Sequence, residues 1–241
     1  MKIFFKTLFR CIAILLVVVS TSKIAVADTD TDNDGVPDAI DGQPLTFNPV
    51  QADISFADAG TAITPTGDFN DGPMAMVLQS DGKPVLAGIT ENAKSRRHMM
   101  LVRYNANGSL DTSFDGDGKL AAVGNAQSYA TSIIQQPDGK LVVAGVKKSG
   151  SFVASVLLRY LPDGLLDTSF GKKGKVVHKI GAGSAASSLV ILPDGRFVVA
   201  GVTRSGSIIG FYVARYKANG GLDHSFGNNG VRVVRVGGGK A

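Results

Sequence analysis

An internal repeat with a period of 56 residues constrains this 241-residue chain more than any other feature. Tyr104, Tyr160 and Tyr216 keep this spacing, and each is followed seven residues later by an aspartate that begins an Asp-Thr/His-Ser-Phe segment. Ser55-Phe56 followed by Gly60 adds a partial copy at the N-terminal side. A repeat of this length is one supersecondary unit that buries its apolar faces against its neighbours. Residues 51–241 are therefore expected to form a β-repeat domain with three repeats and the partial N-terminal copy.

Within the second repeat, the residue pattern predicts four antiparallel strands. Residues 130–135 and 141–146 are rich in apolar and β-branched side chains, and the Pro-Asp-Gly between them predicts a tight turn in which the glycine takes a positive φ. Residues 152–160 and 175–180 are the expected third and fourth strands. The second strand is apolar at four successive positions, so both faces of this sheet should be covered.

Small sheets that stack face to face around an axis are the blades of a β-propeller. The expected fold class is therefore all-β, with three four-stranded propeller-blade-like repeats that form an open or oligomer-completed β-propeller. A sandwich-like or irregular β arrangement is the alternative. Because closed propellers need about four to eight blades, three blades leave an apolar face at each end. We expect homo-oligomers through these faces, for example two chains that make a six-bladed ring.

The repeats also carry a recognisable motif. Residues 136–145 read Gln-Pro-Asp-Gly-Lys-Leu-Val-Val-Ala-Gly, and Leu-Arg-Tyr, Asp-Gly and Leu-Asp-Thr-Ser-Phe-Gly follow. This pattern resembles the delta-60 repeat of exported bacterial proteins over residues 51–236. The resemblance implies a repeat fold and export but no activity, because those repeats are functionally uncharacterised. The first copy departs from it through Pro84, which cannot donate a ladder hydrogen bond, so its second strand should be weakened or lie at an edge.

Residues 1–27 are expected to be a signal peptide. Three basic residues among the first ten precede an apolar run over residues 11–19, and Ala25-Val26-Ala27 offers the small residues of a cleavage site. A buried core helix is the alternative. The run is too short for a stable bilayer anchor, so we expect no transmembrane anchor in the mature chain. The expected location is therefore extracellular or periplasmic.

The placement of charge argues against a nucleic-acid partner. The formal net charge is +5, but the first 27 residues hold four of the 25 Lys and Arg side chains and no acid, which leaves 21 basic against 20 acidic side chains. A nearly neutral mature chain lacks the electrostatic footprint of a nucleic-acid-binding protein. Cys11, the single cysteine, leaves with the signal peptide, so stability must come from packing or metal and not from disulfides.

An acidic segment follows the expected cleavage site, and residues 28–50 are interpreted as a calcium-binding loop and linker. Counting Asp30 as position 1 places oxygen ligands at positions 3, 5, 7, 9 and 12 and Gly35 at the sharp turn, which is the spacing of a calcium loop. The unit resembles the thrombospondin type 3 repeat, and a solvated acidic linker is the alternative. The predicted ligands are the side chains of Asp30, Asp32, Asp34, Asp38 and Asp41 and the carbonyl of Val36.

Two further residue sets recur in the repeats. An arginine precedes each repeat tyrosine and is followed eight residues later by an aspartate, and we expect an ion pair that ties the third strand to the connection after it. A basic residue follows each second strand, and these residues would form a cationic rim for a polysaccharide or protein ligand, unless they are simply solvated. The arginines are Arg103, Arg159 and Arg215, and the rim residues are Lys94, Lys148 and Arg204.

Catalytic signatures are weak. Asp223-His224-Ser225 holds the residue types of a catalytic triad, but neighbours in an extended chain point to opposite faces. Residues 181–186 imitate a dinucleotide fingerprint, but a strand pattern follows them. The sequence thus predicts an exported, non-enzymatic calcium-binding β-repeat protein that acts as a surface or extracellular binding or structural module. A glycan-active or other hydrolase propeller with a rim site is the alternative.

Overall fold

The computed structural model describes residues 56–58, 60–64, 71–122, 126–205 and 208–235. The chain divides into two compact units, residues 1–51 and 52–241, and every described residue belongs to the second unit. The predicted signal peptide and the predicted calcium-binding segment lie outside the described residues. Within the described ranges, no helix is long and apolar enough to cross a membrane.

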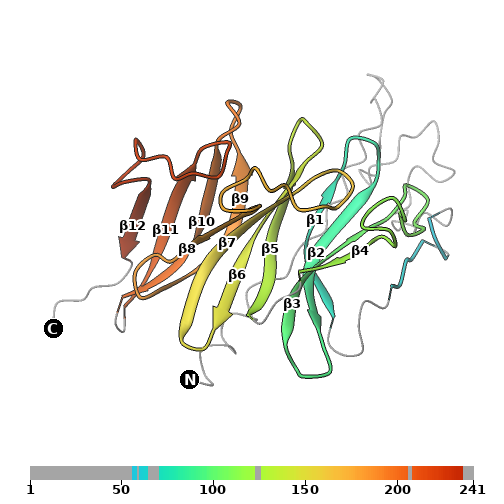
Figure 1. Ribbon diagram of the computed structural model, residues 1–241, viewed down its shortest axis with the longest axis horizontal. Coiled ribbons are helices and arrows are strands. Elements are labelled where there is room, and N and C mark those ends of the chain that lie inside the picture. Colours follow the sequence, from blue (N-terminus) through green and yellow to red (C-terminus); the bar gives the residue numbers. More distant parts are fainter. Residues whose placement is uncertain (1–55, 59, 65–70, 123–125, 206–207, 236–241) are drawn as a thin grey trace, which may run out of the picture. The chain divides into compact units, whose positions relative to one another are not determined.

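The described residues form twelve strands and no helix, in three successive units (Figure 1). Blade 1 contains β1 (Gly72–Leu78), β2 (Pro84–Glu91), β3 (Arg97–Arg103) and β4 (Lys119–Ala121). Blade 2 contains β5 (Gln127–Gln135), β6 (Leu141–Ser149), β7 (Phe152–Tyr160) and β8 (Lys175–His178). Blade 3 contains β9 (Gly183–Ile191), β10 (Phe197–Ser205), β11 (Ile208–Tyr216) and β12 (Val231–Arg235).

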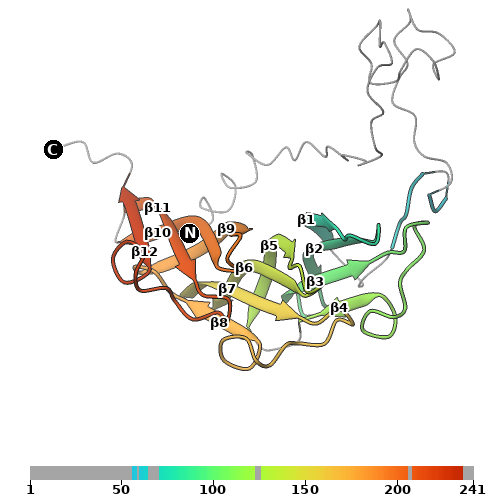
Figure 2. The ribbon, with the colours of Figure 1, turned by 90° about the horizontal axis from the view of Figure 1, so that it is seen from above.

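Each blade is an antiparallel meander. The hydrogen-bonded orders are β1-β2-β3-β4, β5-β6-β7-β8 and β10-β11-β12, and β9 packs beside β10. Figure 2 shows the three blades following one another in chain order. The predicted all-β class with four-stranded blade-like repeats is confirmed. The predicted strand over residues 152–160 is β7, and the predicted first hairpin of the second repeat is β5 and β6.

The turns between the first and second strands explain why this sequence folds into hairpins. Gly82, Gly139 and Gly195 take φ values of 81°, 81° and 79°, a left-handed conformation that favours glycine. In blade 2 the backbone N–H of Gly139 donates to the carbonyl of Gln136 at 2.9 Å and closes the turn. The predicted Pro-Asp-Gly turn with a positive-φ glycine is therefore confirmed.

The innermost strand of blade 2 carries a bulge. The pairing of β5 with β6 gains one residue between Ala130 and Ser132, next to Gly145 of β6. A Cβ on Gly145 would lie 2.1 Å from the carbonyl oxygen of Tyr129, so only glycine fits against the bulged strand. Blade 1 repeats this arrangement with a bulge between Pro73 and Ala75 next to Gly88.

Pro84 does not place its strand at an edge, so of the two predicted alternatives, a weakened strand or an edge strand, the second is wrong. Strand β2 lies between β1 and β3, and Pro84 is its first residue. Its carbonyl still accepts a hydrogen bond from the backbone N–H of Tyr104 at 3.0 Å. A proline at the first position of a strand weakens the hydrogen-bond ladder little, because it lacks one N–H donor but keeps its carbonyl acceptor.

The apolar cores lie between blades, where the face of one sheet packs against the next. We call the contact between blades 1 and 2 seam 1, and that between blades 2 and 3 seam 2. Seam 1 buries Met99, Leu101 and Phe114 of blade 1 against Val143, Val156, Leu158 and Tyr160 of blade 2. Seam 2 buries Val142, Leu157 and Phe170 of blade 2 against Leu189, Phe197, Val199, Tyr212 and Tyr216 of blade 3.

Burial along the strands follows from these seams. All residues from 141 to 146 in β6 are buried, as expected for a sheet that is covered on both faces. In β11 the pattern alternates instead, because only the face toward blade 2 is covered. The described part of the partial copy begins at Phe56 and lies against blade 1, where the backbone N–H of Ala57 donates to the carbonyl of Asn107 at 2.8 Å.

Candidate functional site

The structure describes none of the predicted calcium ligands. Asp30, Asp32, Asp34, Val36, Asp38 and Asp41 all lie outside the described residues. Among the residues that are described, no group of three or more His, Cys, Asp or Glu side chains is placed to hold a metal ion. The sites that can be built from geometry are therefore those of the repeated unit and of the seams.

A cluster that we call the corner recurs in every blade, and blade 2 shows it best. The Nε of Arg159 lies 2.8 Å from Oδ2 of Asp167, and its Nη2 donates to Oγ of Ser169 at 3.2 Å. Ser169 in turn donates its hydroxyl to Oδ1 of Asp167 at 2.6 Å. The guanidinium carbon of Arg159 stands 4.6 Å above the ring centroid of Phe170. The predicted ion pair between the arginine and the aspartate is thus confirmed, with two further members.

The same corner forms in the other two blades. The arginine-to-aspartate distance is 2.8 Å in blade 1 and 2.7 Å in blade 3, and the arginine lies 4.6 Å and 4.9 Å from the phenylalanine ring. A second cation from the hairpin turn also approaches each aspartate, at 2.9, 3.5 and 3.0 Å. The blade 1 members are Arg103, Asp111, Ser113, Phe114 and Lys83, and those of blade 3 are Arg215, Asp223, Ser225, Phe226 and Arg196.

The corner also binds the following blade. Nη1 of Arg103 donates to the carbonyl of Pro162 at 2.5 Å, and Nη1 of Arg159 donates to that of Ala218 at 2.8 Å. One residue after each phenylalanine, a backbone N–H donates to the next carbonyl of the same turn, at 2.8 Å in both seams. The glycine that ends each receiving turn faces the phenylalanine ring. The corner is therefore the joint between blades, which the sequence pattern alone did not reveal.

The electrostatics of the corner keep its aspartates ionised. Burial alone would raise the pKa of Asp167, but hydrogen bonds from Ser169 and the charge of Arg159 outweigh it and lower the pKa to about 2. For Asp111 the same balance, with Ser113, Lys83 and Arg103 as the favourable partners, holds the pKa well below its ordinary value. Charge-assisted hydrogen bonds of this kind stabilise the carboxylate form.

Seam 2 contains a buried polar cluster that seam 1 lacks. The hydroxyls of Ser155 and Tyr212 lie 2.6 Å apart, and Oγ of Ser155 lies 3.1 Å from Oγ of Ser184. Burial raises the pKa of Tyr212 to about 12, so the phenol stays neutral. At the equivalent places of seam 1 stand Met99, Val156 and Ser128, of which Ser128 accepts the backbone N–H of Met99 at 3.1 Å. The hydroxyls of Ser155, Ser184 and Tyr212 are thus hydrogen-bonded within the seam.

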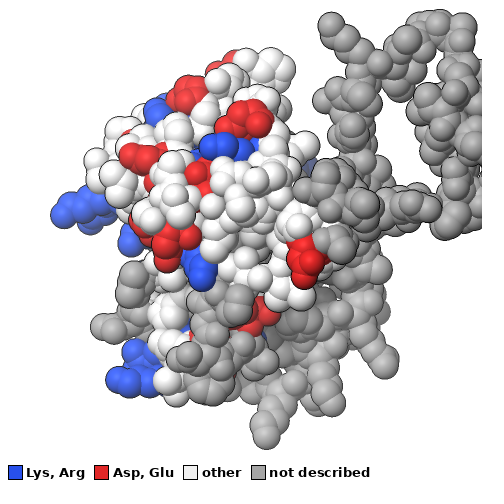
Figure 3. Space-filling model, turned by 90° about the vertical axis from the view of Figure 1, so that its right-hand side faces the viewer, with Lys and Arg blue, Asp and Glu red and all other residues white. Residues whose placement is uncertain are grey.

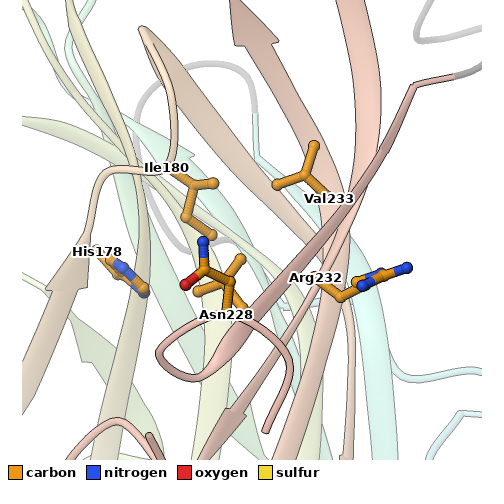
Figure 4. Close-up of a pocket in the computed structure, with 6 residues that line it drawn as sticks. His178, Ile180, Asn228, Arg232 and Val233 are labelled. Atoms are coloured by element: carbon orange, nitrogen blue, oxygen red, sulfur yellow. The ribbon is translucent and has the colours of Figure 1, made fainter.

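A shallow groove of about 410 Å³ runs along the outer side of seam 2. Figure 4 shows the Asn228 amide turned toward His178, with Ile180 beside them, while the Arg232 guanidinium extends away. Nδ1 of His178 lies 2.7 Å from the hydroxyl of Tyr216, and burial lowers the pKa of this histidine. A neutral, hydrogen-bonded His178 here supports the seam.

The predicted rim residues lie near the ends of the second strands. Lys94 and Arg204 are exposed and Lys148 is half-buried. Lys148 and Arg204 each interact with other groups of the protein. The face of the molecule in Figure 3 carries acidic and basic side chains side by side, with no large area of one sign.

The weak catalytic signatures form no site. Ser225 donates its hydroxyl to Asp223 at 2.7 Å as part of the blade 3 corner, while His224 is exposed between them. Residues 181–186 lead into strand β9 and not into a helix, as the sequence predicts. His98 is buried in β3, and its Nε2 lies 3.3 Å from the amide nitrogen of Asn92. His98, His178 and His224 occupy three different positions of the repeat.

Comparison with known families agrees with this geometry. The model of a family described as "Domain of unknown function (DUF5122) beta-propeller" matches residues 79–114, 136–170 and 192–226. The three blades have a β-propeller repeat fold. Each matched segment begins at the first hairpin turn of a blade and ends at the corner phenylalanine. The matches therefore share the register of the blades.

The other comparisons add no function. A solved structure titled "Crystal structure of unknown function protein" from Dyadobacter fermentans DSM 18053 is 14% identical, with a TM-score of 0.48. The match covers 68% of this chain and 42% of the solved chain, so the likeness spans less than half of that protein. No curated protein matches the sequence.

Proposed function

We propose that this chain is an exported, non-enzymatic β-propeller repeat protein of the delta-60 type, which binds calcium through a thrombospondin type 3-like loop and acts as a surface or extracellular binding or structural module. The signal-like residues 1–27 and the aspartate spacing from Asp30 to Asp41 support export and calcium binding. The repeat fold supplies the module.

The observation that carries the non-enzymatic part is the use of the repeated polar residues. In every corner the arginine, the aspartate and the serine contact one another. The arginines of blades 1 and 2 also donate hydrogen bonds to the next blade. A polar set that recurs in all three blades with the same short contacts is explained by blade packing. Asp111, Asp167 and Asp223 are thus held as carboxylates beside arginine, far from the protonation needed of a general acid.

Calorimetry on the full exported chain tests the calcium part. We expect a saturable heat with an affinity on the order of 0.1–1 mM, as in other extracellular calcium modules. Asp34→Ala removes a predicted ligand and should abolish this heat. Asp28→Ala is the matched control, because it removes a charge from the same acidic run at a position outside the ligand set. Equal heats for wild type and Asp34→Ala would contradict the proposed loop.

Export and the lack of turnover are tested separately. N-terminal sequencing of the chain recovered outside the cytoplasm should begin at Asp28, and a chain that retains Met1 in the cytoplasm would contradict the signal peptide. A hydrolase panel beside a glycan-array screen should show binding without turnover. Release of product from any glycan by the purified chain would establish the hydrolase alternative instead.

A further inference from the structure

The two ends of the blade array expose apolar side chains at places that the seams bury. The outer face of blade 3, which we call the tail face, exposes 59% of Phe211, whereas Ser155 at the same place in blade 2 is 3% exposed. The outer face of blade 1, the head face, exposes 38% of Met76, whereas Ile133 at the same place in blade 2 is 6% exposed. The tail face comprises Val190, Ile209, Phe211, Val213 and Val234. The head face comprises the exposed Met76 and Leu78 and the half-buried Leu86, beside Met100 and Val102, which are buried in a cluster against which Ala62 packs.

The tail face ends in a complete corner. In both seams the corner meets the following blade with a phenylalanine ring, an arginine Nη1 and a backbone N–H. Blade 3 presents the same three groups through Phe226, Arg215 and Gly227. The Arg215 side chain is 20% exposed, against 9% for Arg159, because none of the described blades packs beyond it. What fits this corner is therefore another receiving turn.

The head face belongs to a blade with such a turn. Residues 105–108 of blade 1 are equivalent to residues 161–164 and 217–220, which receive the corners of seams 1 and 2. Among the residues that the structure describes, this turn is met by the partial copy. The backbone N–H of Ala57 donates to the carbonyl of Asn107, and the atoms nearest to a Cβ placed on Gly108 belong to Ala57.

The partial copy holds this turn under strain. The residue after the phenylalanine is left-handed at every corner, with φ of 48° at Ala57, 53° at Asp115 and 56° at both Gly171 and Gly227. Glycine adopts this conformation freely and aspartate tolerates it, whereas alanine is disfavoured there. The Gly227 corner is therefore the better partner for the turn that Ala57 occupies.

We propose that the tail face of one chain packs against the head face of a second copy, and that two such seams close a six-bladed ring in which Gly227 replaces Ala57 on the receiving turn. Six blades lie within the range of about four to eight that closed propellers use. Both seams repeat contacts already made twice inside the chain, so the interface needs no new geometry. The inference is independent of calcium binding.

Light scattering on the full chain at micromolar concentration should give twice the mass of one chain. A lone chain would overturn the proposal, and so would an open series of larger species, because head-to-tail contacts that do not close form polymers. Phe211→Lys on the tail face and Leu78→Lys on the head face should each give single chains with an unchanged circular dichroism spectrum. Leu165→Lys is the matched control, since Leu165 is 58% exposed but lies in blade 2, and it should remain paired.

Mixing the two variants identifies the faces. An equal mixture of Phe211→Lys and Leu78→Lys retains one intact head and one intact tail, so a one-to-one assembly of two chains should reappear. A mixture that stays unpaired would overturn the proposal. So would a Leu78→Lys chain that still pairs with itself, because that would show tail-to-tail contact.

A third variant tests the exchange at the receiving turn. Ala57→Gly relieves the strain of the partial copy, which then competes better with Gly227, so the dissociation constant should rise about two- to fivefold. An unchanged or lower dissociation constant would show that Ala57 is not displaced, and would overturn the proposed seam.

Discussion

The two seams share their corners but differ in what fills them. In seam 1, the methyl group of Met99 reaches the glycine of the second strand, Gly145. In seam 2, the ring of Tyr212 reaches the equivalent Gly201, and Ser155 stands where Met99 would be. A long side chain from one blade is thus exchanged for a long side chain from the other. The corner sets the geometry of the joint, and the filling needs only to match it in volume.

Removing the corner phenylalanine should have the largest effect and should be equal in both seams. Phe114 and Phe170 are each fully buried, so either change to alanine should lower the free energy of unfolding by about 3–5 kcal/mol. Urea unfolding followed by circular dichroism measures this. Phe226→Ala in the Leu78→Lys background, in which the chains should stay single, is the control, with a loss of about 1 kcal/mol because that ring is only half-buried in one chain. A difference of more than about 1 kcal/mol between the two buried positions would show that the corners are not equivalent.

Replacing the side chains that fill seam 2 by those of seam 1 should lower the free energy of unfolding by less than the sum of the two single substitutions. Tyr212→Val alone leaves a cavity and should lower the free energy of unfolding by about 2–4 kcal/mol. Ser155→Met alone overpacks the seam and should cost about 1–3 kcal/mol. The double variant imports the seam 1 filling and should cost at least about 1 kcal/mol less than the sum.

The double-mutant cycle, measured by urea unfolding, decides whether the two seams are variants of one design. A control cycle combines Ser155→Met with Val142→Ala. Val142 lies in the same seam, and the residue at its place in seam 1 is also a valine, so it takes no part in the exchange. Additive costs for Ser155→Met and Tyr212→Val would contradict the exchange of volume.

Acid should weaken both seams together. The pKa of Asp167 is about 2 in the folded chain and the ordinary value is 3.8, so the stabilisation is complete above pH 4 and is lost as the pH falls toward 2. Asp111 shifts in the same direction. Urea midpoints should therefore fall in one step below pH 4. Ser169→Ala removes a hydrogen bond to the Asp167 carboxylate, so the urea midpoint should fall less between pH 4 and pH 2 than in the wild type. An unchanged pH profile would contradict the role of Ser169.

The smallest effect should distinguish seam 2 alone. Tyr216→Phe removes the hydrogen bond to His178 and should cost about 1 kcal/mol. Burial lowers the pKa of His178, so the folded chain disfavours its protonation and stability should decrease as the pH falls below 6.5. Melting temperatures at pH 7.5 and pH 5 measure this decrease. Tyr160→Phe is the seam 1 control, because Ala122 takes the place of the histidine there.

The period, the hairpins and the apolar strands were predictable because they depend on local residue pattern. The turn at Gly139 and the whole of β7 follow from neighbours in sequence. The joint did not, because Arg159 reaches Ala218 across 59 residues and its acceptor is a backbone carbonyl, which no residue type marks. The contact between Ser155 and Tyr212 could not be predicted for a similar reason. The small side chain of one repeat is matched by a large side chain of the next, and this match is seen only when the two repeats are compared across a seam. The predicted calcium ligands and the signal peptide stay predictions.

One consequence follows from the acceptors at the joint. Each receiving turn offers its main chain, so Pro162 and Ala218 serve equally well although their side chains differ. Substitutions in these loops therefore leave recognition between neighbouring units intact, provided that the final glycine stays. Because the contact uses backbone carbonyls, the side chains of these turns can vary while one blade still packs against the next.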